Sequence, residues 1–148
     1  MLEEKCIFCK IIRDEIKSYK IFEDDATIAF LDRFPTTYGH TLVIPKVHIG
    51  RIEELNYTEL NSLFFTVQKM VRPILLAVNS TASTIGINDG KDAGQVIPHI
   101  HVHIIPRSKE DNGGNIHSIM NKHLTLDDKT MMNITEKIKN NFKNKDTL

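Results

Sequence analysis

The stretch from His99 to Arg107 carries the side chains best suited to do chemistry. Its three histidines, His99, His101 and His103, alternate with apolar residues. This alternation predicts a β-strand on which the imidazoles leave one face while the apolar side chains enter the core. Same-face neighbours on a strand lie about 6.5 to 7 Å apart, so two rings can act on one phosphate-sized group. Imidazoles titrate near neutral pH, which favours a reaction centre or a metal site over a merely structural strand.

The histidines are preceded by Gly94-Gln95 and followed by Pro106-Arg107. In this setting they resemble the signature of the histidine-triad (HIT) superfamily, and the resemblance extends over roughly residues 5 to 107. It implies hydrolysis or transfer at the α-phosphate of nucleoside phosphoramidates or dinucleoside polyphosphates. The intermediate implied by the resemblance is a covalent nucleotidyl-histidine. The residues implied in catalysis are His101 as nucleophile, His103 as donor to the phosphate or leaving group, and His99 and His40 as supporting histidines.

The resemblance also implies a binding site for a purine nucleotide of the AMP type. Asp32 would hold the ribose hydroxyls, although a solvated loop aspartate is the alternative. The loop before the triad would hold the α-phosphate through Asn88, Gly94, Gln95 and Val96, and the base pocket would consist of Phe8, Ile11, Leu31 and Leu42. Apolar residues at those places are equally typical of a core. Many relatives have serine or threonine where this chain has Val96, so a hydroxyl contact to the leaving group is absent.

Cys6 and Cys9 are the only cysteines and form a Cys-x-x-Cys pair. In a reducing cytosol they would be a thiol redox pair, half of a four-ligand zinc site, or two buried thiols. A redox pair is expected after a strand, and nothing upstream can form one, which favours structural zinc. If two triad histidines stay free for chemistry, His48 and His99 are the better remaining ligands. Bacterial members of the family with this cysteine pair imply the same ligand set.

Three other functions remain open. A zinc-dependent phosphohydrolase would bind its catalytic metal with all three triad histidines, and chelators would stop it. A nucleotide-binding regulatory module would bind without turnover. An RNA-handling protein would need a basic or stacking surface, but the 148 residues hold 19 basic and 19 acidic side chains and no tryptophan. We therefore expect no nucleic-acid partner.

The elements that position these residues follow from local patterns. Short helical and strand patterns are expected at Phe8–Glu15, Tyr19–Glu23, Thr27–Asp32 and His40–Pro45. A long amphipathic helix is expected from Asn56 to about Asn79, with Asn56 as its N-cap and a kink before Pro73. Strands are expected at Thr84–Asn88 and from His99, where Pro98 predicts a sheet edge or a bulge. A last helix is expected from Thr125 to about Phe142, while His117 and His123 are expected at the surface.

These elements predict one α+β domain over residues 1–148, with its core at 5–107 and a C-terminal loop and helix at 108–148. The sheet is expected to have five antiparallel strands, a long helix on one face and shorter helices at both ends. The family resemblance implies a homodimer with a ten-stranded sheet. The chain has no apolar run long enough to cross a membrane and no apolar signal segment, so we expect a cytoplasmic protein without a membrane partner.

Overall fold

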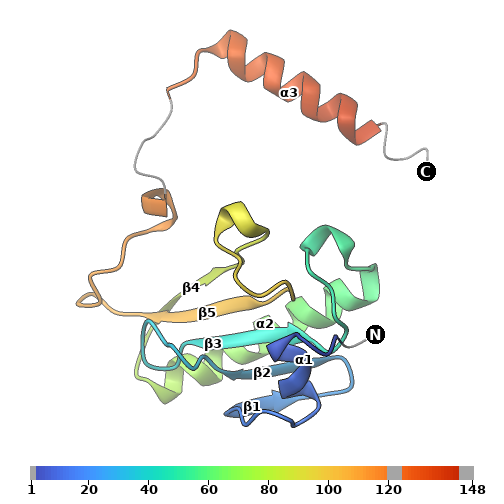
Figure 1. Ribbon diagram of the computed structural model, residues 1–148. Helices are drawn as coiled ribbons and strands as arrows, with labels where there is room; N and C mark the ends of the chain where they lie inside the picture. The colour runs from blue at the N-terminus through green and yellow to red at the C-terminus, as the bar shows by residue number, and fades with distance from the viewer. Residues whose placement is uncertain (1–2, 120–124, 144–148) are drawn as a thin grey trace. The chain divides into compact units, whose positions relative to one another are not determined.

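The structure is a computed structural model that describes residues 3–119 and 125–143. Five antiparallel strands form one sheet in the order β1-β2-β3-β5-β4 (Figure 1). The strands are β1 (Lys20–Glu23), β2 (Thr27–Leu31), β3 (Thr41–Pro45), β4 (Ala82–Gly86) and β5 (Val102–Arg107). The α-helices are α1 (Ile7–Ile12), α2 (Tyr57–Ala77) and α3 (Asp128–Lys143), and short 3-10 turns lie at Ile52–Glu54, Lys91–Ala93 and Ile116–Ile119. The predicted α+β fold class is confirmed.

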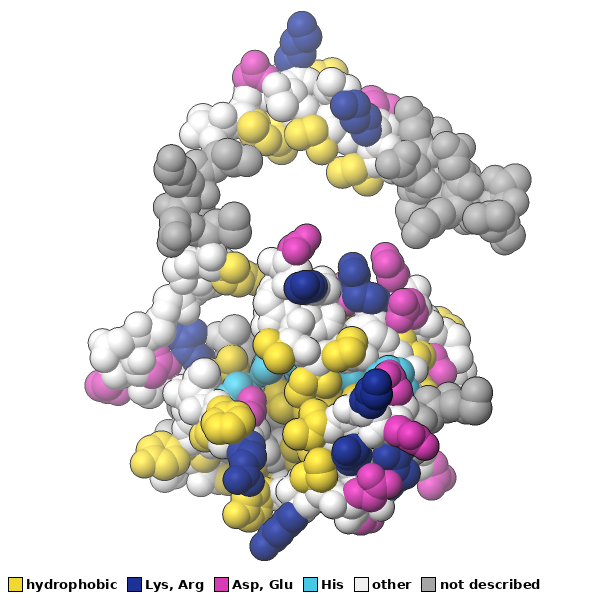
Figure 2. Space-filling model, viewed as in Figure 1, with side chains coloured by type: hydrophobic (Ala, Val, Ile, Leu, Met, Phe, Trp, Pro, Cys, Tyr) yellow, Lys and Arg dark blue, Asp and Glu magenta, His cyan; other side chains and the backbone are white. Residues whose placement is uncertain are grey.

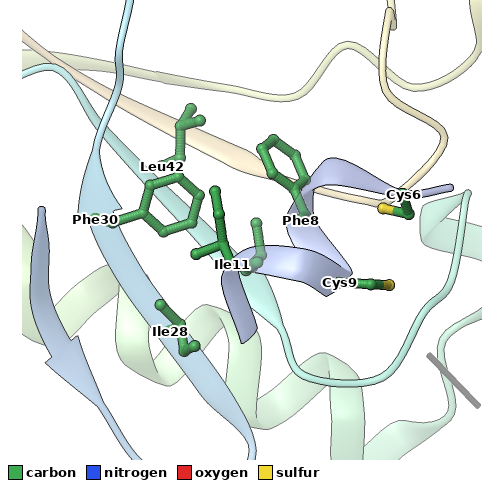
Figure 3. Close-up of a cluster of buried hydrophobic side chains, with 8 residues drawn as sticks. Cys6, Phe8, Cys9, Ile11, Ile28, Phe30 and Leu42 are labelled. Carbon is green, nitrogen blue, oxygen red and sulfur yellow. The ribbon is translucent and has the colours of Figure 1, made fainter. Parts of the chain in front are cut away.

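Both faces of the central strands are covered, so β2 and β3 are buried almost throughout. Alternate side chains enter two separate cores because successive strand residues point to opposite faces. One core joins α2 to the sheet and holds Ala29, Val43, Leu63, Val67, Met70, Ile74, Val102 and Ile104. The other lies under α1 and holds Cys6, Phe8, Cys9, Ile11, Ile28, Phe30, Leu42 and Ile44 (Figure 3). Figure 1 shows the two helices on opposite sides of the sheet.

Helix α2 begins where the sequence predicts. The Asn56 side chain accepts a hydrogen bond from the Glu59 backbone N–H at 3.0 Å, and the Glu59 carboxylate accepts one from the Asn56 N–H at 3.0 Å. This reciprocal cap satisfies two of the donors that a helix start leaves unpaired. The helix continues through Pro73 without interruption. Its buried stripe against the sheet supports the strands that carry the histidines.

The predicted strand at His99 is wrong at its start, because β5 begins at Val102. The His99 N–H bonds to the Ile97 carbonyl at 2.8 Å and the Ile100 N–H bonds to the Ile49 carbonyl at 2.7 Å, so this segment is held by loop contacts outside the ladder. The late start also shifts β4 to Ala82–Gly86, because β4 pairs only as far as His103 on β5. The segment around Asn88 is therefore a loop and not the end of a strand.

Helix α1 ends at Ile12 instead of Glu15. Asp14 has a φ of 59°, in the left-handed region, and this turns the chain away from the helix axis. The chain then enters β1, which pairs with β2 from Lys20 onwards. This tight return places α1 over β2 and β3.

The structure groups the chain into two compact units, residues 1–112 and 113–148. The second unit contains α3, which starts three residues after the predicted Thr125. His117 is exposed, as expected, and His123 lies outside the described residues. None of the helices in the described ranges is long and apolar enough to cross a membrane. The extent of the predicted single domain stays a prediction.

Candidate active site and metal centre

A cavity of about 570 Å³ opens between α1, the β1–β2 edge and the loop before β5. Its lining includes most of the predicted nucleotide site, namely Phe8, Ile11, Leu31, Asp32, Leu42, Asn88, Gly94, Val96, His101 and His103. Figure 2 shows histidine side chains between hydrophobic ones on this face. The volume and the mixture of apolar walls with a few polar groups are typical of a small-molecule site.

The first triad histidine, His99, turns away from this cavity. Its ring Nε2 lies 2.9 Å from the Pro45 carbonyl oxygen, which can only accept, so Nε2 carries the proton. The lone pair on Nδ1 then points at two sulfurs, 3.5 Å from Cys6 Sγ and 3.7 Å from Cys9 Sγ. Both ring nitrogens are thus engaged. His99 does not join the other two triad histidines around one point.

His48 completes a four-ligand cluster with these residues. Its Nε2 donates to the Glu3 carboxylate at 2.8 Å, which leaves the lone pair on Nδ1, 3.3 Å from Cys9 Sγ. All four ligand atoms lie within 4.8 Å of one another. Zinc–sulfur bonds of about 2.3 Å and zinc–nitrogen bonds of about 2.0 Å at tetrahedral angles put sulfur and nitrogen about 3.5 Å apart. The observed separations bracket that value, so the donor set fits a structural zinc ion.

A nearby backbone group also suits a metal-bound sulfur. The Glu3 N–H donates to Cys9 Sγ at 3.3 Å, the kind of outer contact that orients and stabilises a thiolate ligand. Without a metal, burial raises the pKa of the Cys9 thiol. A bound zinc ion would offset that cost because metal coordination deprotonates a thiol.

His101 keeps one nitrogen free on the cavity side. Its Nδ1 lies 2.8 Å from the His99 carbonyl oxygen, so Nδ1 carries the proton. The lone pair is therefore on Nε2. The Phe8 ring packs edge-on against this imidazole, with 5.2 Å between ring centroids, and restricts its rotation.

His40 and His103 form a hydrogen-bonded pair in which His40 is the donor. The Thr36 backbone N–H donates to His40 Nδ1 at 3.2 Å, so the neutral His40 ring carries its proton on Nε2. That N–H points at His103 Nδ1, 2.9 Å away. His103 must then carry its own proton on Nε2, which is buried and has no hydrogen-bond partner among the described residues. The pair therefore presents one unused N–H donor.

Burial keeps His40, His99, His101 and His103 neutral at neutral pH. Loss of hydration lowers the pKa of His99 and of His103 to about 4. The same cause lowers the pKa of His40 and of His101, although the negative charge of Asp32 opposes the shift at both. At neutral pH each ring thus has one lone pair and one N–H, as the hydrogen bonds require.

Asp32 lines the cavity next to the His40–His103 pair. One carboxylate oxygen accepts the Phe34 backbone N–H at 2.9 Å, and the other lies 3.6 Å from His40 Nε2. The side chain is 18% exposed and lines the cavity. It can accept hydrogen bonds from a ligand there while its charge acts on His40.

The predicted phosphate loop is only partly turned to the cavity. Asn88, Gly94 and Val96 line it. Gln95 does not, because its side chain accepts the Gly90 N–H at 2.8 Å and donates to the Gly50 carbonyl at 2.8 Å. Gly94 has a φ of 88°, which favours glycine at this turn. Gln95 thus fixes the loop, and its predicted contact with phosphate stays a prediction.

The family model of the HIT domain matches residues 13–110. The chain belongs to the HIT family. Among curated HIT relatives, an adenylylsulfatase of Arabidopsis thaliana is 40% identical over 110 residues, which cover 74% of this chain and 56% of that protein. An adenosine 5'-monophosphoramidase of Candida albicans is 38% identical and covers 73% and 74%. A bis(5'-nucleosyl)-tetraphosphatase of Schizosaccharomyces pombe is 43% identical, covering 65% and 53%. The chain therefore spans about half the length of two of these relatives.

Solved HIT structures have the same fold. The histidine triad nucleotide-binding protein of Candida albicans has a TM-score of 0.82 at 31% identity, covering 95% of this chain and 99% of that chain. A zinc-bound histidine triad protein of Mycobacterium smegmatis has a TM-score of 0.69 at 34% identity, covering 73% and 78%.

Several lining residues of this HIT chain were not among the sequence predictions, Phe30 and Ser18 among them. Phe30 lies in the cavity wall and in the core under α1, and a strand-centre phenylalanine gives no sign of which wall it faces. Ser18 also lines the cavity. Its signal was weak, because a serine between a helix and a strand is typical of an ordinary turn.

Proposed function

We propose that this HIT protein hydrolyses nucleotides at the α-phosphate through a covalent bond to His101. The observation that carries the proposal is the pairing of two complementary nitrogens in one cavity. His101 offers a lone pair on Nε2, and His103 offers an N–H on Nε2 that has no partner within residues 3–119 and 125–143. The names of the three relatives, all enzymes acting on adenylyl or nucleosyl compounds, support the same class of activity.

The chemistry needs a nucleophile that is neutral at working pH. The lowered pKa of His101 provides it without a separate base. Its Nε2 attacks the α-phosphorus, a nitrogen–phosphorus bond forms, and the bond to the leaving amine, sulfate or phosphate breaks. Water then attacks the same phosphorus, breaks the nitrogen–phosphorus bond and releases a nucleoside monophosphate. One water is consumed, and its two hydrogens go to the phosphate and the leaving group.

His103 acts as an electrostatic donor in this scheme. Its Nε2–H can hydrogen-bond a phosphoryl oxygen or the departing atom, where negative charge develops. His40 acts through His103, because its own N–H holds the His103 tautomer in place. Asn88 and the Gly94 turn approach the phosphate from the loop side, and Asp32 takes the ribose hydroxyls.

The orientation of His99 argues against a catalytic zinc ion on the triad. A triad-bound metal needs one nitrogen from each of the three histidines. Both nitrogens of His99 are already directed elsewhere, to Pro45 and to the two sulfurs. We therefore propose zinc in the cluster of Cys6, Cys9, His48 and His99. There it would link α1 to the loop after β3 and to the segment before β5.

We also propose that the chain forms the homodimer implied by its family. Strand β4 is an edge of the sheet in the described chain, and its Ile85 is 45% exposed. Helix α2 exposes Phe64, Phe65 and Leu76. An uncovered edge with apolar neighbours is suited to pairing with another chain. The molar mass in solution tests this assembly.

Turnover of defined substrates tests the activity. Adenosine phosphoramidate, AMP-lysine and dinucleoside polyphosphates are incubated with the purified protein and its His101→Ala variant, with the exposed His117→Ala as the histidine control. We expect turnover in the wild type and the control and none in His101→Ala, whose AMP affinity stays within a few fold. A tenth of wild-type turnover in His101→Ala refutes the nucleophile. Nucleotide binding without product in any protein would instead support a regulatory module.

A further inference from the structure

The loop before the histidines is attached to the rest of the chain at one place. Within residues 3–119 and 125–143, the hydrogen bonds that join loop residues 89–95 to other segments all end on residues 50–52. One attachment is the Gln95 side chain, which donates to the Gly50 carbonyl. The other is the Asp89 carboxylate. The position of the loop therefore depends on these two side chains.

Asp89 binds two donors through one oxygen. Its Oδ1 accepts the Ile52 backbone N–H at 3.1 Å and the Arg51 Nε–H at 3.2 Å. The Arg51 guanidinium also packs against the loop, because a Cβ added to Gly90 would lie 3.0 Å from its Nη1. An ion pair near the surface contributes little by itself. The bond to a backbone N–H and the close packing are what make Asp89 a fixed point.

The segment that receives Asp89 also holds the nucleophile. The Ile49 carbonyl accepts the Ile100 N–H at 2.7 Å, directly before His101 in the chain. Residues 49–52 thus support both the loop and the segment that carries the reactive imidazole. Asn88, the neighbour of Asp89, lines the cavity on the loop side. The contact of Asp89 with residues 51 and 52 therefore sets where the loop lies relative to His101.

We propose that Asp89 is a positioning residue that holds the phosphate-binding loop in place for the reaction. The proposal rests on the proposed function, in which Asn88 and the Gly94 turn approach the α-phosphate. Asp89 is not among the described side chains that line the cavity, so it acts through the loop and not on the ligand. Without it the loop must be ordered when substrate binds, which lowers affinity for the phosphate. The phosphorus is also held less well in line with His101, which slows the reaction.

Two ligands and two variants of Asp89 test this role. AMP presents a phosphate to the loop, whereas adenosine presents none. We expect Asp89→Ala to weaken AMP by about 3- to 10-fold and to leave adenosine within about twofold. On the substrate that the wild type turns over fastest, kcat should fall by about 10- to 100-fold. Asp89→Asn keeps an oxygen that can accept both hydrogen bonds, so its AMP affinity and kcat should stay within about threefold of wild type.

Asp24 supplies a matched control. Its carboxylate also holds a turn, because Oδ1 accepts the backbone N–H groups of Ala26 and Thr27 at 2.9 and 2.7 Å. This turn joins β1 to β2, and Asp24 is not among the described residues that line the cavity. Asp24→Ala removes a comparable contact, so it should lower the unfolding temperature at least as much as Asp89→Ala. Its AMP affinity and kcat, measured below that temperature, should equal those of the wild type.

The outcomes separate this inference from the proposed function. If the wild type neither binds AMP nor turns over any of the proposed substrates, both are refuted. If the wild type is active and Asp89→Ala keeps its kcat and AMP affinity, the proposed function stands and the positioning role is wrong. Equal weakening of AMP and adenosine would show general damage to the cavity and refute the role.

The two remaining variants can refute it as well. A kcat of Asp24→Ala as low as that of Asp89→Ala would mean that turnover follows stability and not the position of the loop. An Asp89→Asn protein as impaired as Asp89→Ala would overturn the argument from the hydrogen bonds to Arg51 and Ile52.

Discussion

Removal of the cysteine ligands should release zinc and destabilise the whole fold. The cluster joins Cys6 and Cys9 to His99. Cys6 precedes His99 by 93 residues and Cys9 precedes it by 90. If the metal acts as a cross-link closing a loop of 93 residues, the loss of unfolded-chain entropy corresponds to about 4 to 5 kcal/mol at 25 °C. We therefore expect Cys6→Ala or Cys9→Ala to lower the unfolding temperature by about 10 to 20 °C.

Two measurements check this expectation. Elemental analysis of protein purified without chelator should find one zinc ion per chain in the wild type and none in either variant. Thermal unfolding should then be compared between the variants and wild-type protein stripped of metal. Because the stripped protein keeps both thiols, the difference from it isolates the packing of the cysteine side chains from the effect of the metal.

The turnover of the folded fraction should persist without zinc, since His101 needs no metal. A wild-type protein without bound metal would refute the zinc centre and return Cys6 and Cys9 to the role of buried thiols. An unfolding temperature that shifts by less than about 3 °C on metal removal would refute the cross-link argument. Loss of turnover in metal-free protein that is still folded would favour the metallohydrolase.

Three further predictions concern the cavity. Asp32→Ala should weaken AMP by about 1 to 3 kcal/mol in calorimetry and remove discrimination against 2′,3′-dideoxy nucleotides; an equal loss for both ligands would contradict ribose recognition. His40→Phe should lower kcat by about 10- to 100-fold, because His103 loses the donor that fixes its tautomer; unchanged kcat would refute this positioning role. Burial lowers the pKa of His101, and it lowers the pKa of His103 to about 4, so kcat/KM should stay high below pH 6.5 and fall only as the pH passes the lowered values; an acid limb at or above 6.5 would contradict it.

Local patterns were sufficient for much of the fold. The Asn56 cap and the apolar stripe of α2 each depend on near neighbours in sequence, and each is found in the structure. The alternating histidines predicted the strand β5 correctly only from Val102 onwards. The cysteine pair and its two histidine partners also come together as predicted. The Cys-x-x-Cys spacing restricted these choices, because such a pair supplies two of the four ligands of a structural zinc site and histidine is a usual ligand for the rest.

Other features depend on contacts between distant segments. His99 turns to the cysteines because Ile49 and Ile97 hold the chain before β5, and nothing in the alternating pattern indicates these bonds. The position of β4 follows in turn from the late start of β5. Register and ring tautomers are properties of the assembled sheet and cannot be read from one segment.

The cysteine-bearing helix has a consequence for the order of biosynthesis. Helix α1 is translated before its partners in the proposed zinc cluster, because His48 and His99 follow its cysteines by 39 to 93 residues. Its apolar face can pack on β2 and β3 early, but the proposed zinc cluster can be completed only after His99 has been translated. Contacts of such long sequence separation form slowly. The wall that carries Phe8 should therefore be the last part of the cavity to become rigid in a nascent chain.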